Sequence, residues 1–388
     1  MSDNSINERG PGFNDRRSML AGISGLAAGA ILAGHAQAGP LNPPPGPIAP
    51  TPGPEPRIAI NSTNTPGNAE SIYRISVPGS YYLTDNITGV LATGKTGIEI
   101  ASSNVSIDLM GFHITGGSGT VDGIGTAGSS DPENIRICNG VVRGWGRLGI
   151  RIGFTTASPG VILDRIVSSG NGTHGIYAGK DSVLHHCIAT DNGDYGFLAG
   201  ANITMHACSA AGNAGTGIYV SSNSTLMQSV ARNNGEHGIE CAQSCIVHRC
   251  AARENDLSGF SIGSQSVIAE CVAAANKDDG IRCIGNTIIR GNQCSSNANT
   301  SFNGVGIRIS GGNNRIEDNN CVSNNIGLYA AGAGNFIARN SCSDNTLNWS
   351  IVSGNVCLIV QAANSGSITG NSGGVSPGST NPNANYTY

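Results

Sequence analysis

The sequence has 388 residues, of which 57 are glycine and only 12% are charged, and its formal net charge is −4. Ordinary soluble proteins contain about 7% glycine and about 25% charged residues, so this composition suits stacked strands with tight turns better than amphipathic helices. The weakly acidic balance leaves no basic stripe, which argues against a nucleic-acid partner.

The first 38 residues have the features of an export signal. The motif DRRSML at 15–20 resembles a twin-arginine signal, an apolar, glycine-rich run follows at 21–34, and AQA at 36–38 offers a small-residue cleavage site. The apolar run is too short and too rich in glycine to span a membrane. We therefore predict a twin-arginine-type signal peptide and an exported protein of the periplasm, cell envelope or extracellular space. The alternative is an irregular N-terminus with a chance arginine pair.

Twin-arginine export carries proteins that are already folded. The twelve cysteines would then meet a reducing cytoplasm first, which weakens the usual expectation of disulfides in an exported protein.

Two short segments precede the repetitive part of the chain. Residues 39–56 contain nine prolines, which predicts a stiff, extended linker without a core of its own. Residues 57–96 combine strand-like alternation with turn residues, and we predict that they form an N-terminal cap over the first rung. Such a cover is needed because an open strand edge invites aggregation.

The central part repeats with a period of 21 residues. A glycine followed by an apolar residue marks the period, and an asparagine lies four positions upstream of each glycine. The marks are Gly175, Gly196, Gly217, Gly238, Gly259 and Gly280, and the asparagines are Asn171, Asn192, Asn213, Asn234, Asn255, Asn276 and Asn297. Further columns hold small residues, Ala189, Ala210, Ala231, Ala252 and Ala273 beside Cys187, Cys208, Ser229, Cys250 and Cys271. Columns in one register are the signature of a solenoid.

The same mark extends the repeat in both directions. It continues upstream through Gly149, Gly123 and Gly97 at intervals of 26, and downstream through Gly306, with an insertion at 299–305, and Gly327 to Asn348. A rung of 21 residues is too short for a βαβ unit and fits three short strands joined by turns. We predict an all-β solenoid of about twelve rungs at 97–370 and a flexible tail at 371–388.

Stacking gives each column a role. Neighbouring rungs lie about 4.8 Å apart, so Leu184, Met205, Leu226, Val247 and Ile268 form an inward apolar row. The asparagine column suits a sharp bend, because asparagine tolerates left-handed backbone geometry, and its amides can hydrogen-bond along the stack.

The marks HGIY, YGFL, TGIY, HGIE and DGIR, the asparagine column and the segment NVSIDLMGFHITG at 104–116 resemble the right-handed parallel β-helix proteins of the pectate lyase-like superfamily. The resemblance covers about 57–370. It implies a right-handed parallel β-helix, but it leaves activity open, since the superfamily includes polysaccharide lyases, hydrolases, uronate epimerases and proteins without known catalysis.

Each repeated glycine is expected to begin a strand, and one column of residues in these strands is expected to face outward. It lies two positions after each glycine and reads Tyr177, Leu198, Tyr219, Glu240, Ser261, Arg282, Arg308 and Tyr329. Tyrosines along a sheet face could stack on sugar rings, and the charged residues could supply polar contacts. The alternative is a solvated face in which tyrosine reflects strand propensity alone.

Charged and aromatic residues gather near Gly238 and Gly280. We predict His237, Glu240, Asp279 and Arg282 as catalytic residues and Tyr177, Tyr195, Tyr219 and Lys277 as substrate-binding residues. A lyase or C5-epimerase must neutralise the uronate carboxylate, for which Arg282 or Lys277 is suited, and move protons, for which His237 or Tyr219 is suited. A hydrolase would instead pair Glu240 with Asp279.

Metal sites are open alternatives. Asp278 and Asp279 could bind Ca²⁺, which prefers oxygen ligands, although no cofactor is firmly indicated. His185, His206 and His248 share one column, interrupted by Met227, and such a row could bind copper or be a plain surface row. Three functions thus remain: polysaccharide binding with lyase or epimerase activity, a non-catalytic glycan-binding or structural solenoid, and copper handling.

Overall fold

The structure is a computed structural model that describes residues 56–127, 132–153, 160–297, 304–361, 369–370 and 381–388. Within these residues every regular element is a β-strand. The predicted signal peptide, nearly all of the linker and most of the insertion at 299–305 lie outside the described residues.

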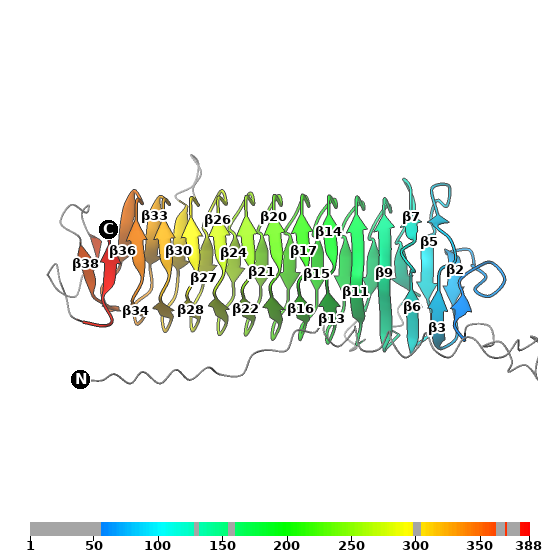
Figure 1. Cartoon of the computed structure of the whole chain (residues 1–388), viewed down its shortest axis with the longest axis horizontal. Coiled ribbons are helices and arrows are strands. Elements are labelled where there is room, and N and C mark those ends of the chain that lie inside the picture. The colour runs from blue at the N-terminus through cyan, green and yellow to red at the C-terminus, as the bar shows by residue number, and fades with distance from the viewer. Residues whose placement is uncertain (1–55, 128–131, 154–159, 298–303, 362–368, 371–380) are drawn as a thin grey trace, which may run out of the picture. The chain divides into compact units, whose positions relative to one another are not determined.

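One sheet contains 14 strands, each hydrogen-bonded to the next (Figure 1). Its strands are β2 (Ser71–Ile75), β5 (Thr96–Ile100), β8 (Ile124–Thr126), β10 (Ile150–Ile152), β12 (Ile176–Ala178), β15 (Phe197–Ala199), β18 (Ile218–Val220), β21 (Ile239–Cys241), β24 (Phe260–Ile262), β27 (Ile281–Cys283), β30 (Val305–Ile309), β33 (Ile326–Ala330), β36 (Leu347–Ile351) and β39 (Thr369–Gly370). We call it the marked sheet, because the repeated glycines precede or begin its strands.

The second sheet contains 26 strands and supplies the other two sides of each coil. One side consists of β1 (Ile58–Ala59), β3 (Gly79–Tyr82), β6 (Val105–Asp108), β13 (Val183–His185), β16 (Thr204–His206), β19 (Thr225–Met227), β22 (Ile246–His248), β25 (Val267–Ala269), β28 (Ile288–Arg290), β31 (Arg315–Glu317), β34 (Phe336–Ala338) and β37 (Val356–Cys357). The other consists of β4 (Ile87–Thr88), β7 (His113–Thr115), β14 (Ile188–Thr190), β17 (Ser209–Ala211), β20 (Val230–Arg232), β23 (Ala251–Arg253), β26 (Val272–Ala274), β29 (Gln293–Ser295), β32 (Asn320–Val322), β35 (Ser341–Ser343), β38 (Ile359–Gln361) and β40 (Asn385–Thr387). The strands β9 (Ile135–Arg143) and β11 (Ile162–Ser169) run across both sides.

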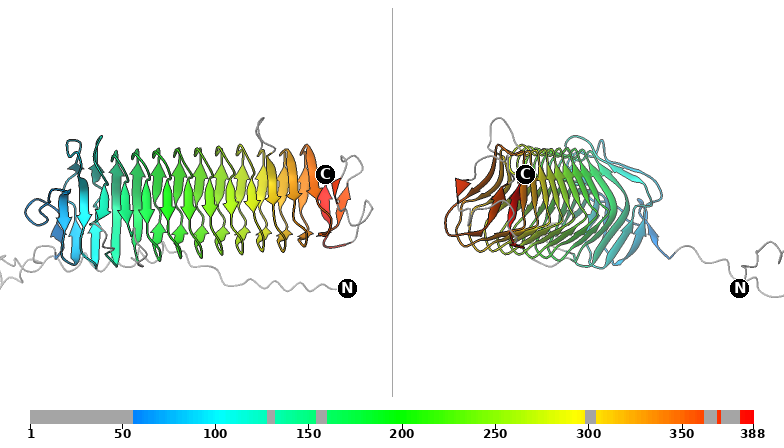
Figure 2. Two further views of the ribbon diagram at one scale, coloured as in Figure 1. Left: turned by 180° about the vertical axis from the view of Figure 1, so that it is seen from behind. Right: turned by 60° about the vertical axis from the view of Figure 1, so that its left-hand side comes forward.

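Successive coils pair in parallel, so the described chain is a β-helix in which each 21-residue coil contributes three short strands (Figures 1 and 2). In the coil after Gly175 these are β12, β13 and β14, and each pairs with the strand 21 residues later. The marked sheet has two strands beyond the twelve predicted positions, β2 and β39. Because β2 pairs with β5 and β3 pairs with β6 in parallel, coiling already begins inside the predicted cap.

Each coil turns at three bends, and one residue at each bend adopts a left-handed conformation. In the coil that starts at Gly175 these residues are Asp181, His186 and Asp191, with φ between 52° and 59°. The corresponding residues of later coils include alanine, glutamine, arginine and glutamate, for which left-handed geometry is unfavourable. The prediction that the asparagine column itself adopts this geometry is wrong, since the left-handed residue lies one position earlier.

The asparagine column instead acts through its side-chain amides. The Nδ2 of Asn234 donates to Oδ1 of Asn255 at 2.9 Å, and the backbone N–H of Asn234 donates to the same oxygen at 3.1 Å. The pattern runs without interruption from Asn171 to Asn345. The predicted amide ladder along the stack is therefore present, and it pairs backbone N–H groups that are buried at the bend.

The marked glycines are required by this ladder. A Cβ added at Gly238 would lie 2.6 Å from Nδ2 of Asn255 and 2.7 Å from the carbonyl oxygen of Gly259. No side chain larger than hydrogen fits between these atoms. The glycine and asparagine columns thus share one register because the amide of the next coil fills the space above each glycine.

A second bend, between the two sides of the second sheet, uses the same hydrogen bond from a backbone N–H to a side chain of the next coil. There Cys208 N donates to Ser229 Oγ, Cys250 N to Cys271 Sγ and Cys271 N to Oδ1 of Asn292. From Asn292 onward this column is an asparagine ladder through Asn319, Asn340 and Asn385. Ser229 and Cys271 of the predicted column thus act as hydrogen-bond acceptors for the preceding coil.

The interior holds the inward rows that the repeat predicts. Leu184, Met205, Leu226, Val247 and Ile268 are each at most 1% exposed. All twelve cysteines are buried and free.

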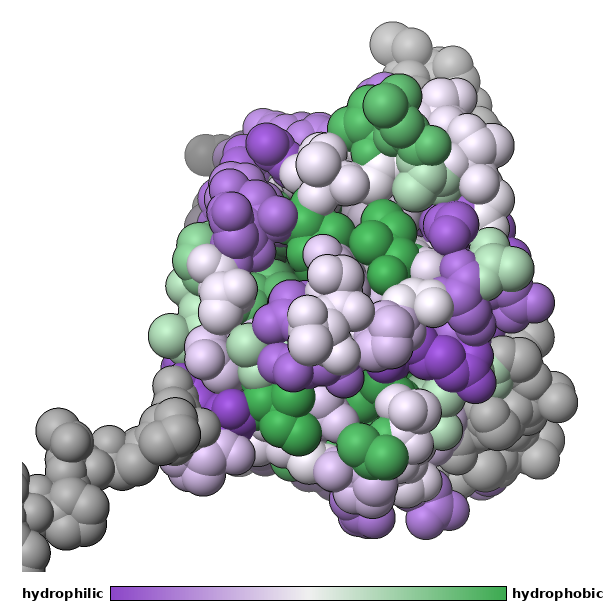
Figure 3. Space-filling view, turned by 90° about the vertical axis from the view of Figure 1, so that its right-hand side faces the viewer, coloured by the Kyte–Doolittle hydropathy of each residue, from purple (hydrophilic) through white to green (hydrophobic). Residues whose placement is uncertain are grey.

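The last described residues form part of the helix. Strand β40 lies between β35 and β38 and pairs with both, and Trp349 Nε1 donates to Thr387 Oγ1 at 2.6 Å. The predicted tail therefore does not extend to the end of the chain, although 371–380 lie outside the described residues. At the opposite end the first coils expose Val77, Val90 and Leu91, and Figure 3 shows apolar groups interspersed with polar ones on that face.

We expect Asn255→Ala to lower the free energy of unfolding by about 1–3 kcal/mol, because it leaves the buried N–H of Asn234 without an acceptor. Urea unfolding followed by circular dichroism measures the change. The control is Asn233→Ala at an exposed left-handed bend, a position type that alanine already occupies at Ala275. Equal losses in the two variants would contradict this role for the ladder.

Candidate functional site

The outward column of the marked sheet is the surface that the sequence predicts to be functional. Its members pair in register from coil to coil, Tyr177 with Leu198, Leu198 with Tyr219, Tyr219 with Glu240, Glu240 with Ser261, and Ser261 with Arg282. Each is partly exposed between two buried strand neighbours, as the period of two requires. These side chains therefore form one row along the β-helix.

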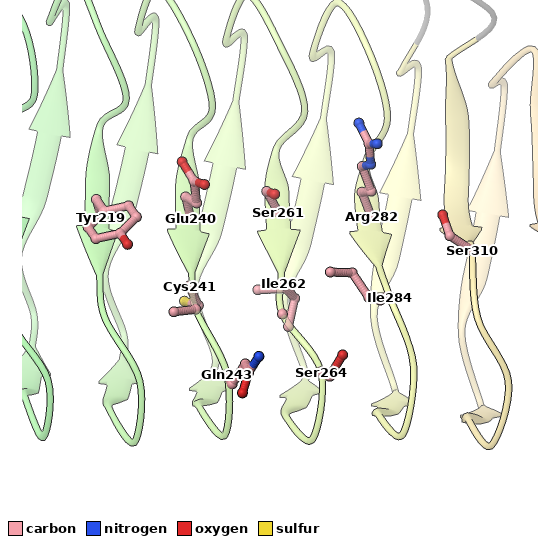
Figure 4. A pocket seen from close by; sticks show the side chains of 12 residues that line it. Tyr219, Glu240, Cys241, Gln243, Ser261, Ile262, Ser264, Arg282, Ile284 and Ser310 are labelled. Carbon is pink, nitrogen blue, oxygen red and sulfur yellow. The ribbon is translucent and has the colours of Figure 1, made fainter.

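Part of this row borders a hollow of 500 Å³ (Figure 4). Ser261 lies at its centre, and Glu240 and Arg282 stand on the two neighbouring coils. These two charged residues are thus two coils apart, roughly 10 Å. Tyr219 and Ile284 complete the border, so the hollow combines an acid, a base, a hydroxyl, an aromatic ring and an aliphatic side chain.

The charges of the hollow are available to a ligand. Arg282 is exposed and Glu240 is half-buried, and within the described part of the chain neither forms a salt bridge. A guanidinium with free donors can bind a carboxylate in bidentate fashion. The hollow could therefore hold an anionic group next to Arg282.

An aromatic cluster adjoins the hollow on the side of the earlier coils. The ring centroids of His174 and Tyr195 are 5.3 Å apart, and those of Tyr195 and Tyr219 are 6.1 Å apart. Burial, with a contribution from Glu240, raises the pKa of Tyr195 and of Tyr219. Both phenols therefore keep their protons at neutral pH and can donate hydrogen bonds.

His237 does not line the hollow. It precedes Gly238, in the row that contains Thr216 and Ser258 on the adjacent coils, and its Nδ1 is buried without a hydrogen-bond partner. The neighbouring Glu236 accepts a hydrogen bond from Thr216 Oγ1 at 3.1 Å. The predicted group of four catalytic residues is thus divided, with Glu240 and Arg282 together and His237 apart.

Asp279 has a structural role that the sequence does not reveal. It is 1% exposed, and its carboxylate accepts hydrogen bonds from the N–H of Val305 at 3.0 Å and from Nε of Arg308 at 2.5 Å. Asp122 makes the same contacts with Leu148 N–H and Arg151. Both aspartates precede the glycine that starts a 26-residue coil, and both close that longer coil onto the arginine 29 residues later.

These contacts are at odds with two predictions. A carboxylate committed to Arg308 and buried from solvent cannot pair with Glu240 as a hydrolase would require. Asp278 accepts a hydrogen bond from Ser258 Oγ at 2.9 Å, so the two neighbouring carboxylates, considered above for Ca²⁺, serve different partners in this conformation. Burial also raises the pKa of Asp279, against the opposing effect of Arg308.

Two of the predicted substrate-binding residues lie away from the hollow. Lys277 pairs with Asp256 at 2.6 Å in a separate hollow at the bend that carries the asparagine ladder. Tyr177 lies two coils before Tyr219, with Leu198 between them. Of the predicted binding residues, Tyr219 alone lines the hollow. The ring of Tyr195 lies next to the ring of Tyr219.

The sequence placed Ser261 in the outward column but not among the site residues, and it did not indicate Gln243 and Ile284 as lining residues. The role of Ser261 follows from its size, because a short side chain between Glu240 and Arg282 leaves a gap. Gln243 and Ile284 lie beyond the ends of their strands, where period-two reasoning no longer fixes direction.

The histidine column is present as a surface row. His185 pairs with His206, His206 with Met227, and Met227 with His248. In the described conformation no three histidine, cysteine or acidic side chains within the described ranges converge on a point that could hold a metal ion.

No helix among the described residues is long and apolar enough to cross a membrane.

Comparison with known proteins defines the fold. A family model described as a right handed beta helix region matches residues 122–266. The A-modules of the Azotobacter vinelandii mannuronan C-5 epimerases AlgE4 and AlgE6 are each 16% identical, with TM-scores of 0.52 and coverage of 70% and 72% of this chain and 90% of theirs. The Dettilon tailspike protein is 15% identical over 82% of this chain and 60% of its own, with a TM-score of 0.43. A search of curated protein sequences finds no match.

We expect the stability difference between the wild type and Asp279→Asn to shift in favour of the variant as pH rises. A carboxyl whose folded pKa is raised above its ordinary value of 3.8 binds protons more readily in the folded state, so its contribution to stability falls as pH rises through that window. Urea midpoints at pH 4 and pH 7 measure the shift. Asp278→Asn is the matched control, and a shift in the opposite direction would mean that the Arg308 pair outweighs burial.

Proposed function

We propose that this right-handed parallel β-helix is an exported protein that binds an anionic, uronate-containing polysaccharide along the outward column of the marked sheet. The hollow bordered by Tyr219, Glu240 and Arg282 is the observation that carries the proposal.

Chemistry supports an anionic sugar at this place. The exposed guanidinium of Arg282 offers donors in the geometry of a carboxylate. Tyr219 and Tyr195 offer protonated hydroxyls and ring faces, and aromatic rings contribute large contact areas at low entropic cost. Glu240 and Ser261 can accept and donate hydrogen bonds to sugar hydroxyls. The structural likeness to epimerases that are named for mannuronan agrees with this substrate class.

Export is supported by the N-terminal sequence. The DRRSML motif and the AQA site fit a twin-arginine route. Twelve free, buried thiols suit a protein that folds in a reducing compartment before export.

Turnover is the second candidate function. A lyase or C5-epimerase requires a group that removes the C5 proton and a group that returns one, close to the cation that neutralises the carboxylate. Tyr219 lies three coils before Arg282, roughly 14 Å, which is too far for both to act on one sugar, and the raised pKa of Tyr219 makes its phenolate a scarce base. His237 lies outside the hollow and Asp279 is paired with Arg308. The geometry therefore favours binding over catalysis.

We expect Arg282→Ala to weaken binding of polyuronate oligosaccharides at least about tenfold, since a hydrogen bond to a charged group contributes about 1.5–3 kcal/mol. Isothermal titration calorimetry with polyuronates and with neutral glucans measures the effect. Arg290→Ala is the matched control, because Arg290 is also exposed but lies on β28 of the second sheet. Equal affinities in both variants would remove the hollow from the binding site.

Incubation of the wild-type chain with polyuronates separates the two candidate functions. We expect saturable binding with neither unsaturated products, detected by ultraviolet absorbance, nor C5 inversion, detected by proton NMR. Appearance of either product, abolished by Tyr219→Phe, would instead establish an enzyme that uses this hollow.

A further inference from the structure

Three histidines gather on a part of the β-helix that the proposed function does not use. His185 ends β13 and His206 ends β16, and the two lie opposite each other in the parallel pairing of these strands. His186 follows at the left-handed bend, with φ of 52°. This group, which we call the histidine triangle, lies on the second sheet, whereas the hollow lies on the marked sheet.

The spacing of the three rings is nearly equal. The ring centroids of His185 and His206 are 5.9 Å apart, those of His186 and His206 are 5.9 Å apart, and those of His185 and His186 are 6.2 Å apart. The centre of such a triangle is about 3.5 Å from each centroid. An ion bound to an imidazole nitrogen at 2.0–2.1 Å lies about 3.2 Å from the ring centroid. By the same geometry, three imidazoles on one tetrahedral ion have centroids about 5.2 Å apart. The three rings do not converge on such a point in the metal-free conformation, but each pair has to approach by only about 1 Å or less once the rings turn.

We propose that His185, His186 and His206 bind one divalent first-row transition-metal ion, Cu²⁺ or Zn²⁺, with Asp164 as the fourth ligand. Asp164 lies opposite His185 in the pairing of β11 with β13, and its Oδ1 is 3.6 Å from Nδ1 of His186. Imidazole nitrogen suits these ions better than it suits Ca²⁺ or Mg²⁺, and copper and zinc lie at the strong end of the affinity series.

Metal binding requires ring rotation, because Nε2 of His206 and the carboxylate of Asp164 have other partners in the metal-free conformation. Nε2 of His206 is 2.6 Å from Oε1 of Gln228, and Asp164 pairs with Arg165 at 2.8 Å. His186 is 53% exposed and Arg165 is 59% exposed, whereas Asp164 is 15% exposed, so the imidazole rings can turn without moving the paired strands. Gln228 and Arg165 act as competitors that the ion displaces.

The remaining histidine of the column, His248, is not part of the histidine triangle. His248 lies two coils beyond His206, with Met227 between them, and its Nε2 is 3.4 Å from Glu270. The copper site predicted from the column is thus replaced by a site that spans two coils and includes His186, which the column does not contain.

Titration of the tag-free full chain with Cu²⁺ and, separately, with Zn²⁺ tests the proposal. We expect one saturable site per chain, and an affinity reduced at least about tenfold in His186→Ala and in His206→Ala, since even the loss of a second-shell partner costs 10–100-fold. His248→Ala is the matched control and should keep wild-type affinity. Gln228→Ala should bind more tightly, because it removes the competitor for His206.

Electron paramagnetic resonance of the Cu²⁺ complex reads the ligands directly. We expect coupling to three imidazole nitrogens in the wild type and to two in His186→Ala, with unchanged circular dichroism and unchanged polyuronate affinity. Absence of a one-to-one site, coupling to fewer than three nitrogens in the wild type, or equal loss of affinity in His248→Ala would overturn the proposal. Because polyuronate binding is measured separately, failure of the metal site leaves the hollow unaffected.

Discussion

The bends of the β-helix depend on one hydrogen bond, from a backbone N–H of one coil to a side-chain oxygen or sulfur of the next. Where a strand pair ends, the ladder no longer supplies a carbonyl, and the buried N–H needs another acceptor. Asn255 meets this need for Asn234, Ser229 for Cys208, and Asn314 for Thr287. All three bends thus use side-chain acceptors of the next coil, and these hydrogen bonds offset the cost of the left-handed residue that precedes each bend.

This constraint explains why the architecture was predictable. An amide acceptor must recur once per coil, and the glycine beneath each amide cannot be replaced by a residue with a side chain. The asparagine and glycine columns therefore share one period, which is visible in the sequence. The outward column was predictable because side chains alternate between the two faces of a strand. The left-handed residues were assigned one position too late because they include side chains such as Glu254 and Ala275, which carry no conformational signature. Strand β40 escaped prediction because Asn385 joins its ladder 45 residues after Asn340.

The candidate site was harder to predict because structural and functional charges are the same residue types. Asp279 and Glu240 look alike in the sequence, but only Asp279 has an arginine placed to neutralise it, 29 residues away across a coil of unusual length. A buried carboxylate demands a partner, whereas a half-exposed one does not. Partner searches at coil-length separations, here for Arg151 and Arg308, would have removed Asp279 from the catalytic set and kept Glu240 and Arg282.

The uniform coil also acts as a ruler. Groups on the outward column can be separated only by whole multiples of about 4.8 Å, because register shifts of single residues would break all three acceptor ladders at once. Loss or duplication of a complete 21-residue coil, in contrast, leaves every ladder intact. The distance between Glu240 and Arg282 can therefore change, during evolution or by engineering, only in steps of one coil. A variant with one coil more or fewer would hold the same two charges about 4.8 Å further apart or closer together.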